Sequence, residues 1–499
     1  MATIDQIQIN IAPFDVRQGG FTGGAINATT KSGTNDFHGS VYGFGNNEDL
    51  VGRHYLNPDG SYAKPYDKEK EYLAGITLGG PIVKNKLFFF ANYERSKKEY
   101  PNLYTFGADG LKVPTELATS ILDAVKDMAH QQGYDYNGQF STSDKYIRSE
   151  KYGLKLDWNI NDFNKLTFRY SHVDGQQLNG LGGISSVNTF DHEYEFQHRT
   201  NSFMMELQSR LSPNLSNEAR VSFASVRDRR AAGAPFPQVT VYNVGTGDNK
   251  GTVNIGNEYS SMANALDQDI WTFEDNFTWY KGNHTFTFGT HNEMYKFRNL
   301  FIQNLYGCYY FQDYTNFWNY YQGFLNGTPD GSLIRNFYFK QANVDVTGDP
   351  RWAAEFSAAQ LGFYVQDKWD ATDNFQLTYG LRMELPLFFD RPAANVAFNE
   401  YAASKGWNLK TNQKLRSQPM WSPRLGFRWD IQNNRKYILR GGVGVFTGRI
   451  PFVWLSNSFS NTGIQLESYS SGGFQNLRLL LDPNNQTANA ELLRASGSQ

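Results

Sequence analysis

Residues 361–383 read LGFYVQDKWDATDNFQLTYGLRM, and apolar and polar side chains alternate along both halves of this stretch. In the second half, one face carries Phe375, Leu377, Tyr379, Leu381 and Met383, and the other carries Gln376, Thr378, Gly380, Arg382 and Glu384. A period of two is typical of a β-strand, and residues 371–374 between the halves are turn formers. Each half has about the length of a tilted strand that crosses a bilayer. The stretch therefore predicts a β-hairpin of membrane-spanning length.

The same unit recurs along the chain. We predict thirteen strands, at residues 37–45, 72–80, 87–95, 154–158, 166–170, 203–211, 219–223, 271–279, 286–288, 361–369, 375–383, 425–429 and 437–445. A weaker fourteenth would lie at residues 474–481. Turns within the hairpins are short, whereas long polar segments separate the hairpins, at residues 96–147, 172–201, 227–268, 298–359 and 386–423. A compact soluble domain seldom tolerates so many long connections.

These patterns predict an all-β fold, a transmembrane antiparallel up-and-down β-barrel with short periplasmic turns and long extracellular loops. The apolar face of each strand would meet lipid, and the face with Lys, Arg, Glu and Gln would meet water inside. Tryptophans near strand ends would form an aromatic girdle, at Trp158, Trp279, Trp369 and Trp429. Residues 114–132 have a helical period, and we expect this helix on the outer surface of its loop, ending at Gly133.

The composition argues against several classes of protein. The 47 Lys and Arg residues nearly balance the 49 Asp and Glu residues, so we expect no nucleic-acid partner. The single cysteine, Cys308, excludes an intrachain disulfide and a cysteine-based zinc site. No apolar run is long enough for a membrane-spanning helix, and no signal peptide is visible after Met1.

Patterns that would indicate an enzyme are weak. His192-Glu193 begins a zinc-protease motif, but Phe196 stands where the second histidine is required. Asp267 and Asp269 could form a glycosidase pair, although two acids near a loop are more often solvated. We therefore expect no enzyme activity, no catalytic residue, no cofactor and no metal ion. The glycines at residues 441–444 favour close packing of another domain on the inner face of a strand.

One long loop, residues 305–321, is dense in aromatic rings. Candidate ligand contacts there are Tyr310, Phe311, Trp318, Tyr320 and Tyr321. Exposed rings stack on sugars and peptides, which favours a binding surface. The same rings could instead pack the loop against its neighbours, and the sequence leaves both interpretations open.

The N-terminal region carries a family resemblance. Residues 15–35 read DVRQGGFTGGAINATTKSGTN. This glycine-rich segment follows a short predicted strand at 4–11, contains a second one at 26–31, and precedes the first predicted barrel strand. With the following residues to 45, the segment resembles the plug-to-barrel junction of TonB-dependent outer-membrane receptors, most closely the Oar-like subgroup. The motif residues are Arg17, Gly19, Gly20, Gly23, Gly24, Lys31 and Gly33. Residues 79–90, 364–382 and 422–444 extend the resemblance along the chain.

The resemblance implies a twenty-two-stranded barrel, closed by an N-terminal plug, that imports a nutrient with energy supplied through TonB. Residues 1–35 would be the end of the plug, and residues 36–499 an incomplete barrel. We expect an internal fragment without most of the plug and without the segment that binds TonB. Its partners would be outer-membrane lipid, TonB through that missing segment, and a small nutrient, glycan or peptide. The alternatives are a barrel that serves as an adhesin or assembly protein, and a soluble β-rich carbohydrate-active enzyme.

Overall fold

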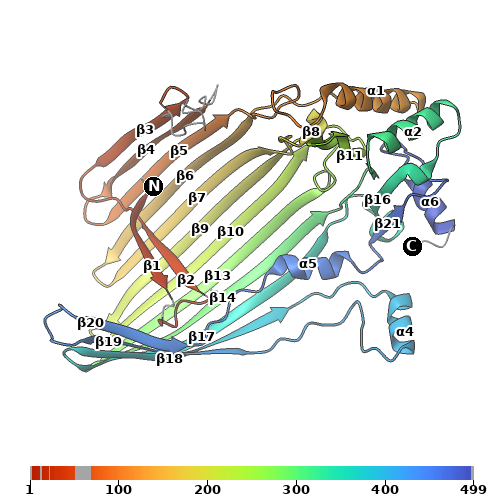
Figure 1. Ribbon diagram of the computed structural model, residues 1–499. Coiled ribbons are helices and arrows are strands. Elements are labelled where there is room, and N and C mark those ends of the chain that lie inside the picture. Colours follow the sequence, from red (N-terminus) through yellow and green to blue (C-terminus); the bar gives the residue numbers. More distant parts are fainter. Residues whose placement is uncertain (1–2, 12–13, 22, 51–68, 496–499) are drawn as a thin grey trace.

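Thirteen strands form one large antiparallel sheet in the computed structural model, which describes residues 3–11, 14–21, 23–50 and 69–495. They are β3 (His38–Asn47), β4 (Lys70–Val83), β5 (Leu87–Tyr100), β6 (Lys145–Asn161), β7 (Asn164–Asn179), β9 (Tyr194–Ser212), β10 (Leu215–Ala232), β13 (Asn264–Lys281), β14 (His284–Phe301), β17 (Ala354–Thr372), β18 (Phe375–Phe388), β19 (Met420–Asp430) and β20 (Ile438–Gly444). Each strand pairs with the next in chain order (Figure 1). The thirteen predicted strands and their up-and-down order are confirmed.

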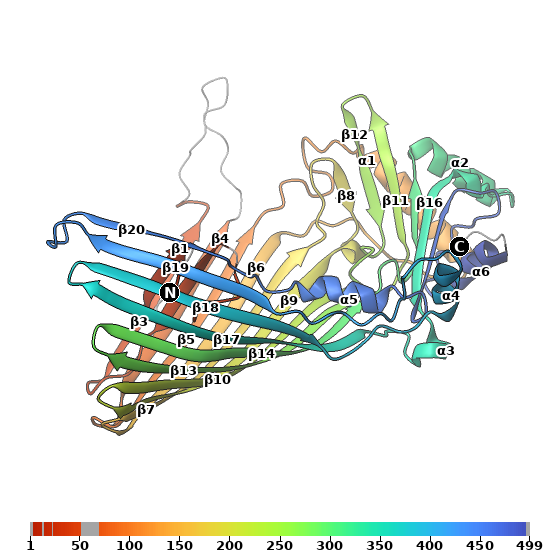
Figure 2. The same cartoon turned by 90° about the horizontal axis from the view of Figure 1, so that it is seen from below.

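The sheet curls into an open trough, which we call the wall (Figure 2). Its two edge strands, β3 and β20, do not pair with each other among the described residues, so the wall does not close into a barrel there. None of the helices in the described part of the chain is long and apolar enough to cross a bilayer.

The two faces of the wall differ as the alternation predicts. Large apolar side chains such as Trp271, Phe273 and Leu381 are exposed on the outward face. The concave face is polar: on it Arg220 of β10 forms ion pairs with Glu206 of β9 and Glu274 of β13. Directly paired residues of neighbouring strands share a face, so these contacts run across the wall as a continuous polar band.

The strands are longer than predicted. β9 and β17 each contain 19 residues, and strands rise about 3.3 Å per residue. Their ends therefore project beyond the apolar band, and parts of the predicted loops are strand. One row of charged, directly paired outward-facing residues crosses eight of these extensions: Arg95, Glu150, Asp174, Arg199, Arg227, Asp267, Arg298 and Glu355. Asp267 and Asp269 pair with arginines here, which argues against a glycosidase pair.

At the long-loop end, the connections fold into a separate body that we call the outer module (Figure 2). Its sheet contains β8 (Ser186–Asn188), β11 (Gln238–Thr246), β12 (Asn249–Ile255), β15 (Cys308–Phe311), β16 (Ile334–Ala342) and β21 (Leu466–Gly472), with two parallel pairs. The sequence predicts long loops at residues 172–201, 227–268 and 298–359, and these segments supply all the strands of this sheet except β21. The predicted strand at residues 474–481 is wrong, because irregular chain there buries Leu477, Leu479 and Leu481 in the module core.

Six α-helices lie among the described residues: α1 (Thr115–Gln131), α2 (Tyr314–Leu325), α3 (Val344–Thr347), α4 (Val396–Ser404), α5 (Phe452–Ser460) and α6 (Thr487–Ala495). Short 3₁₀ turns lie at Phe190–His192 and Gly331–Leu333. The predicted helix is α1, and Gly133 follows it with a φ of 82°. Its apolar face, with Ile121, Val125 and Met128 fully buried, packs into the module core. The helix is therefore an integral part of the module.

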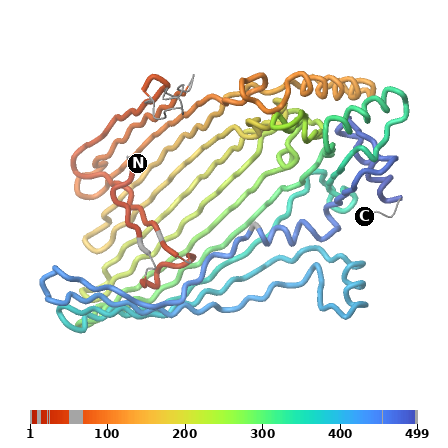
Figure 3. The backbone as a smooth tube through the Cα atoms, in the orientation of Figure 1, coloured from red at the N-terminus to blue at the C-terminus, as the bar shows by residue number. Residues whose placement is uncertain are grey.

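The N-terminal strands β1 (Ile4–Ile11) and β2 (Gly24–Thr30) form a hairpin of their own. It lies within the trough, and residues 14–21 between its strands pass along the concave face near β17–β20 (Figures 1 and 3). Both strands were predicted.

Candidate functional site

Residues 14–21, which we call the N-terminal segment, pack directly on the concave face of the wall. Val16 is fully buried, and its N–H donates to Oε1 of Gln366 on β17 at 3.0 Å. A Cβ atom at Gly380 on β18 would lie 2.7 Å from Cγ1 of Val16. Phe14 likewise occupies the space that Cβ atoms at Gly426 and Gly442 would need. The wall thus has glycines where the segment approaches; of the glycines at residues 441–444, Gly442 makes room for Phe14, whereas Cβ atoms at Gly441 and Gly444 would meet Phe427, and Arg424 and Phe446, respectively.

Two arginines of the wall hold the carbonyl groups of the segment. Nη1 of Arg382 donates to the carbonyl oxygen of Val16 at 3.1 Å. Nη1 of Arg424 donates to the carbonyl oxygens of Asp15 and Gln18 at 2.8 and 2.7 Å. These carbonyls need donors because the segment has no regular secondary structure. Hydrogen bonds from charged donors are among the stronger ones, so they position the segment without a large apolar interface.

Arg382 belongs to a buried ion pair. Its Nη2 lies 2.9 Å from Oε1 of Glu384 two residues along β18, and the two side chains are 2% and 1% exposed. Thr447 donates to the other oxygen of Glu384. Burying two charges is tolerated only when their hydrogen bonds are satisfied. The segment, the wall and Thr447 together supply those bonds.

The motif residues divide between two places on the wall. Gly19 lies against Arg382, since a Cβ atom there would be 2.4 Å from its Cζ, and Gly20 has a φ of 74°. Gly33 instead approaches the backbone of β4 and β5, where a Cβ atom would be 2.3 Å from the carbonyl oxygen of Phe89. Lys31 precedes it and donates its N–H to Thr3. Gly23 precedes β2, and Gly24 is its first residue. The motif therefore attaches the hairpin to both sides of the trough.

The side chain of Arg17 is exposed. Its Nη2 lies 2.6 Å from Oδ2 of Asp15, and its side chain is 48% exposed. The hydrogen bonds that Arg17 donates to the carboxylate of Asp15 raise the pKa of Arg17 above the usual value, so this side chain remains a cation at physiological pH.

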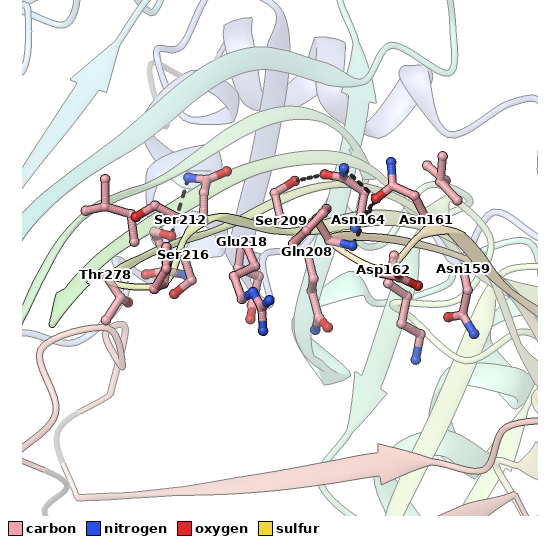
Figure 4. Close-up of a pocket in the computed structure, with 18 of the residues that line it drawn as sticks. Asn159, Asn161, Asp162, Asn164, Gln208, Ser209, Ser212, Ser216, Glu218 and Thr278 are labelled. Carbon is pink, nitrogen blue, oxygen red and sulfur yellow. Dashed lines mark hydrogen bonds between the residues drawn. The ribbon is translucent and has the colours of Figure 1, made fainter.

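Arg17 also lines a cavity of about 930 Å³ at the short-turn end of the wall. The lining residues labelled in Figure 4 come from strand ends and turns, and all of them are polar: Asn159, Asn161, Asp162, Asn164, Gln208, Ser209, Ser212, Ser216, Glu218 and Thr278. Oγ of Ser209 donates to Oδ1 of Asn164 at 2.8 Å. A polar lining of this size fits hydrated solutes or polar protein surface better than an apolar ligand.

A second segment, residues 445–465, which we call the strap, covers the N-terminal segment from the other side. Gly448 forms an isolated parallel bridge with Gly20. The rings of Phe446 and Phe21 are 5.7 Å apart, and Cζ of Arg424 lies 4.8 Å from the first ring and 5.7 Å from the second. Cation–π contacts with both rings thus join the strap to the N-terminal segment.

The rest of the strap follows the concave wall toward the outer module. Arg449 forms an ion pair with Glu293 of β14. Phe452 and Phe459 of α5 pack on inward-facing rings of β14 and β17, with centroids 4.5 Å from Tyr295 and 5.0 Å from Phe356. Beyond α5 the chain enters β21, so the strap joins the N-terminal segment to the module. Sequence reasoning missed the strap because its contacts join residues that are far apart in the sequence, such as Arg449 and Glu293, which are 156 positions apart.

The aromatic loop has both buried and accessible rings. Phe311 and Tyr320 are buried in the module core, and the N–H of Leu479 donates to the Tyr320 hydroxyl at 2.7 Å. Burial raises the pKa of Tyr320 to about 12. Tyr310, Trp318 and Tyr321 are only half-buried. The packing interpretation therefore describes Phe311 and Tyr320, and ligand contact stays a hypothesis for the other three.

Comparisons with known proteins agree with this architecture. Residues 29–118 and 109–492 match a family model described as an outer membrane beta barrel domain. The chain is 32% identical over 171 residues to the TonB-dependent transporter Oar of Myxococcus xanthus, a match that covers 33% of this chain and 15% of that protein.

Two solved structures share the fold at low identity. The outer membrane transporter YddB from Escherichia coli matches with a TM-score of 0.58 and 13% identity, over 94% of this chain and 50% of the other. The siderophore receptor PirA from Acinetobacter baumannii matches with a TM-score of 0.50 and 14% identity, over 90% and 48% of the two chains. The chain thus spans about half the length of these solved relatives.

Proposed function

The chain belongs to the outer membrane beta barrel domain family, and on this premise we propose that it is part of a TonB-dependent receptor that imports a nutrient. Its location is the bacterial outer membrane, where the outward apolar face meets lipid. We assign residues 1–35 to the end of the plug and residues 36–499 to part of a twenty-two-stranded barrel. The outer module would face the medium and the short turns the periplasm.

The observation that carries this proposal is the way the N-terminal segment is held. Its carbonyl oxygens accept hydrogen bonds from Arg382 and Arg424, and its side chains Phe14 and Val16 insert against glycines of the wall. Such contacts can be broken and re-formed without exposing a large apolar core, because water can replace each hydrogen bond. A segment that must move under a pulling force, and return, would be attached in this way.

The extracellular side would capture the nutrient. Tyr310, Trp318 and Tyr321 are candidates for contact with a glycan or peptide, since exposed ring faces stack on such ligands. The related protein from Acinetobacter baumannii is a siderophore receptor, which adds iron complexes to the ligands worth testing.

A reversible disulfide between segment and wall tests the proposal. Val16→Cys with Gly380→Cys in the full-length receptor would place two sulfur atoms within bonding reach, because Cγ1 of Val16 lies 2.7 Å from the ideal Cβ position at residue 380. A strain without the gene would be complemented with this variant and grown on limiting iron, glycan and peptide sources. We expect growth on at least one source to require both the reduced form and an intact TonB system.

The two single-cysteine variants are the controls, and the growth of each should be the same under oxidising and reducing conditions, whatever its level relative to the wild type. Uptake that persists with the disulfide formed, or without TonB, would contradict gated transport. If the double-cysteine variant with the disulfide formed loses cell attachment but shows no growth defect, the result would favour an adhesin rather than a transporter.

A further inference from the structure

A hollow of about 380 Å³ lies where the strap meets the outer module. Lys340 of β16 and Arg494 of α6 line it, together with Glu467 and Ser468 of β21 and Asn461 of the strap. Lys340, the continuous stretch 460–469 and Arg494 therefore meet around one small polar space, of a size suited to a small ligand or one group of a larger one.

The charges around this hollow are unbalanced. Nη2 of Arg494 lies 2.8 Å from Oε2 of Glu467, so these two charges compensate each other. Nζ of Lys340 instead bonds to the neutral Oδ1 of Asn461 at 3.4 Å, and within the described ranges it has no acidic partner. Burial lowers the pKa of Lys340, and no nearby acid opposes that shift. A half-buried ammonium group without a counter-charge is costly, which an anion in the hollow would relieve.

We propose that this hollow binds a carboxylate or phosphate group of a solute, with Lys340 as its main charge partner. The Ser468 hydroxyl and the Asn461 amide, which also line the hollow, can donate further hydrogen bonds to anionic oxygens. A role of this site in recognising an imported solute rests on the function proposed above. The binding of an anion is inferred from the geometry of the hollow alone.

The hollow is also connected to the N-terminal segment. Of its strap residues, Ser460 is the last residue of α5, the helix that packs on the wall, and Asn461 and Gly463 directly follow it. At the other end of the strap, Phe446 and Gly448 contact Phe21 and Gly20. An anion that fixes Asn461 against Lys340 would restrict the outer end of the strap. We expect it to order the inner end as well, because the two ends belong to one continuous segment.

Calorimetric titration of the purified full-length receptor in detergent, with inorganic phosphate and with citrate, tests the site. We expect at least one anion to bind, and Lys340→Met to weaken that binding at least tenfold. The matched control is Arg335→Met, which removes an exposed cation of the same strand that lies over Tyr242, outside the hollow. The affinity for the anion should also decrease as the pH is raised. The decrease should begin at a lower pH than an ordinary lysine would give, because the lowered pKa of Lys340 makes its ammonium group lose its proton earlier.

Hydrogen exchange of the same samples tests the connection. The bound anion should slow exchange at residues 445–451 and 14–21 in the wild type and in the Arg335→Met variant, but not in Lys340→Met. The site is wrong if neither anion binds, or if both variants bind equally well. If the anion binds but protects only residues around the hollow, the connection is wrong. These measurements use no energised membrane, so failed transport and a failed anion site remain distinguishable.

Discussion

The wall and the outer module are both β-sheets, yet they are assembled in opposite ways. In the wall, each strand pairs with its neighbour in chain order, and the alternation of side chains places one face in lipid and the other in water. The module collects strands from separate loops, includes parallel pairs, and buries a shared apolar core. The wall therefore depends on local pairing and on its solvent, and the module on contacts between distant segments.

The largest expected effect is on the module core. Phe311 is fully buried and packs edge-to-face on Phe317 and Tyr320 at 5.2 and 5.7 Å. Phe311→Ala should destabilise the module by about 3–5 kcal/mol, the usual cost of a buried Phe→Ala change. Limited proteolysis of the full-length protein in membranes should then cut within residues 101–144 and 303–343, while the wall stays resistant.

Tyr321→Ala is the matched control, because this ring is half-buried at the edge of the same core and bonds to Asp127. It should leave the module protected. Loss of wall resistance in Phe311→Ala would mean that the two regions are one cooperative unit, contrary to the comparison.

A smaller effect is expected from charges placed on the two faces of the wall. Val221 of β10 lies on the outward face, opposite Phe273, and Ser222 lies on the concave face, opposite Thr272. Val221→Arg should cost about 2–4 kcal/mol, the range for arginine at the bilayer midplane. Ser222→Arg should cost much less, because that face is polar. Urea unfolding of the full-length protein in lipid vesicles would measure both.

The two substituted residues are adjacent in sequence. If both substitutions destabilise the protein to a similar extent, the assignment of the outward face to lipid is wrong. A larger effect of Ser222→Arg would reverse the two faces.

How far the sequence predicts the structure follows from the same comparison. The wall was predictable because each of its strands and short turns follows from the pattern of neighbouring residues. The family resemblance read from residues 15–45 is confirmed by the match to Oar. The sequence also predicted that Arg382 faces inward. Its bond to Val16 was not predictable, because the two residues are 366 positions apart. The module, the strap and the hollow around Lys340 depend on such distant contacts. The periodicity of apolar residues in the sequence does not indicate which distant residues meet.

The smallest expected effect concerns the row of charges that crosses the extended strands. Arg298 of β14 lies between Asp267 and Glu355, at 4.0 and 3.4 Å. Arg298→Glu would place three acids side by side and should cost about 0.5–1 kcal/mol, since exposed pairs contribute little and like charges repel. Thermal unfolding of the full-length protein in detergent at low and high salt would measure it, with Arg298→Gln to separate lost attraction from added repulsion.

The salt dependence of the stability cost shows whether the row of charges contributes through electrostatic attraction or through packing. Screening acts on exposed charges, so the cost of Arg298→Glu should shrink at high salt, and Glu355→Arg in the same chain should restore one pair. A cost that salt does not change would mean that Arg298 contributes through packing of its aliphatic stem. The row would then belong with the module, whose stability comes from burial, rather than with the wall, whose outward face is defined by the solvent that it meets.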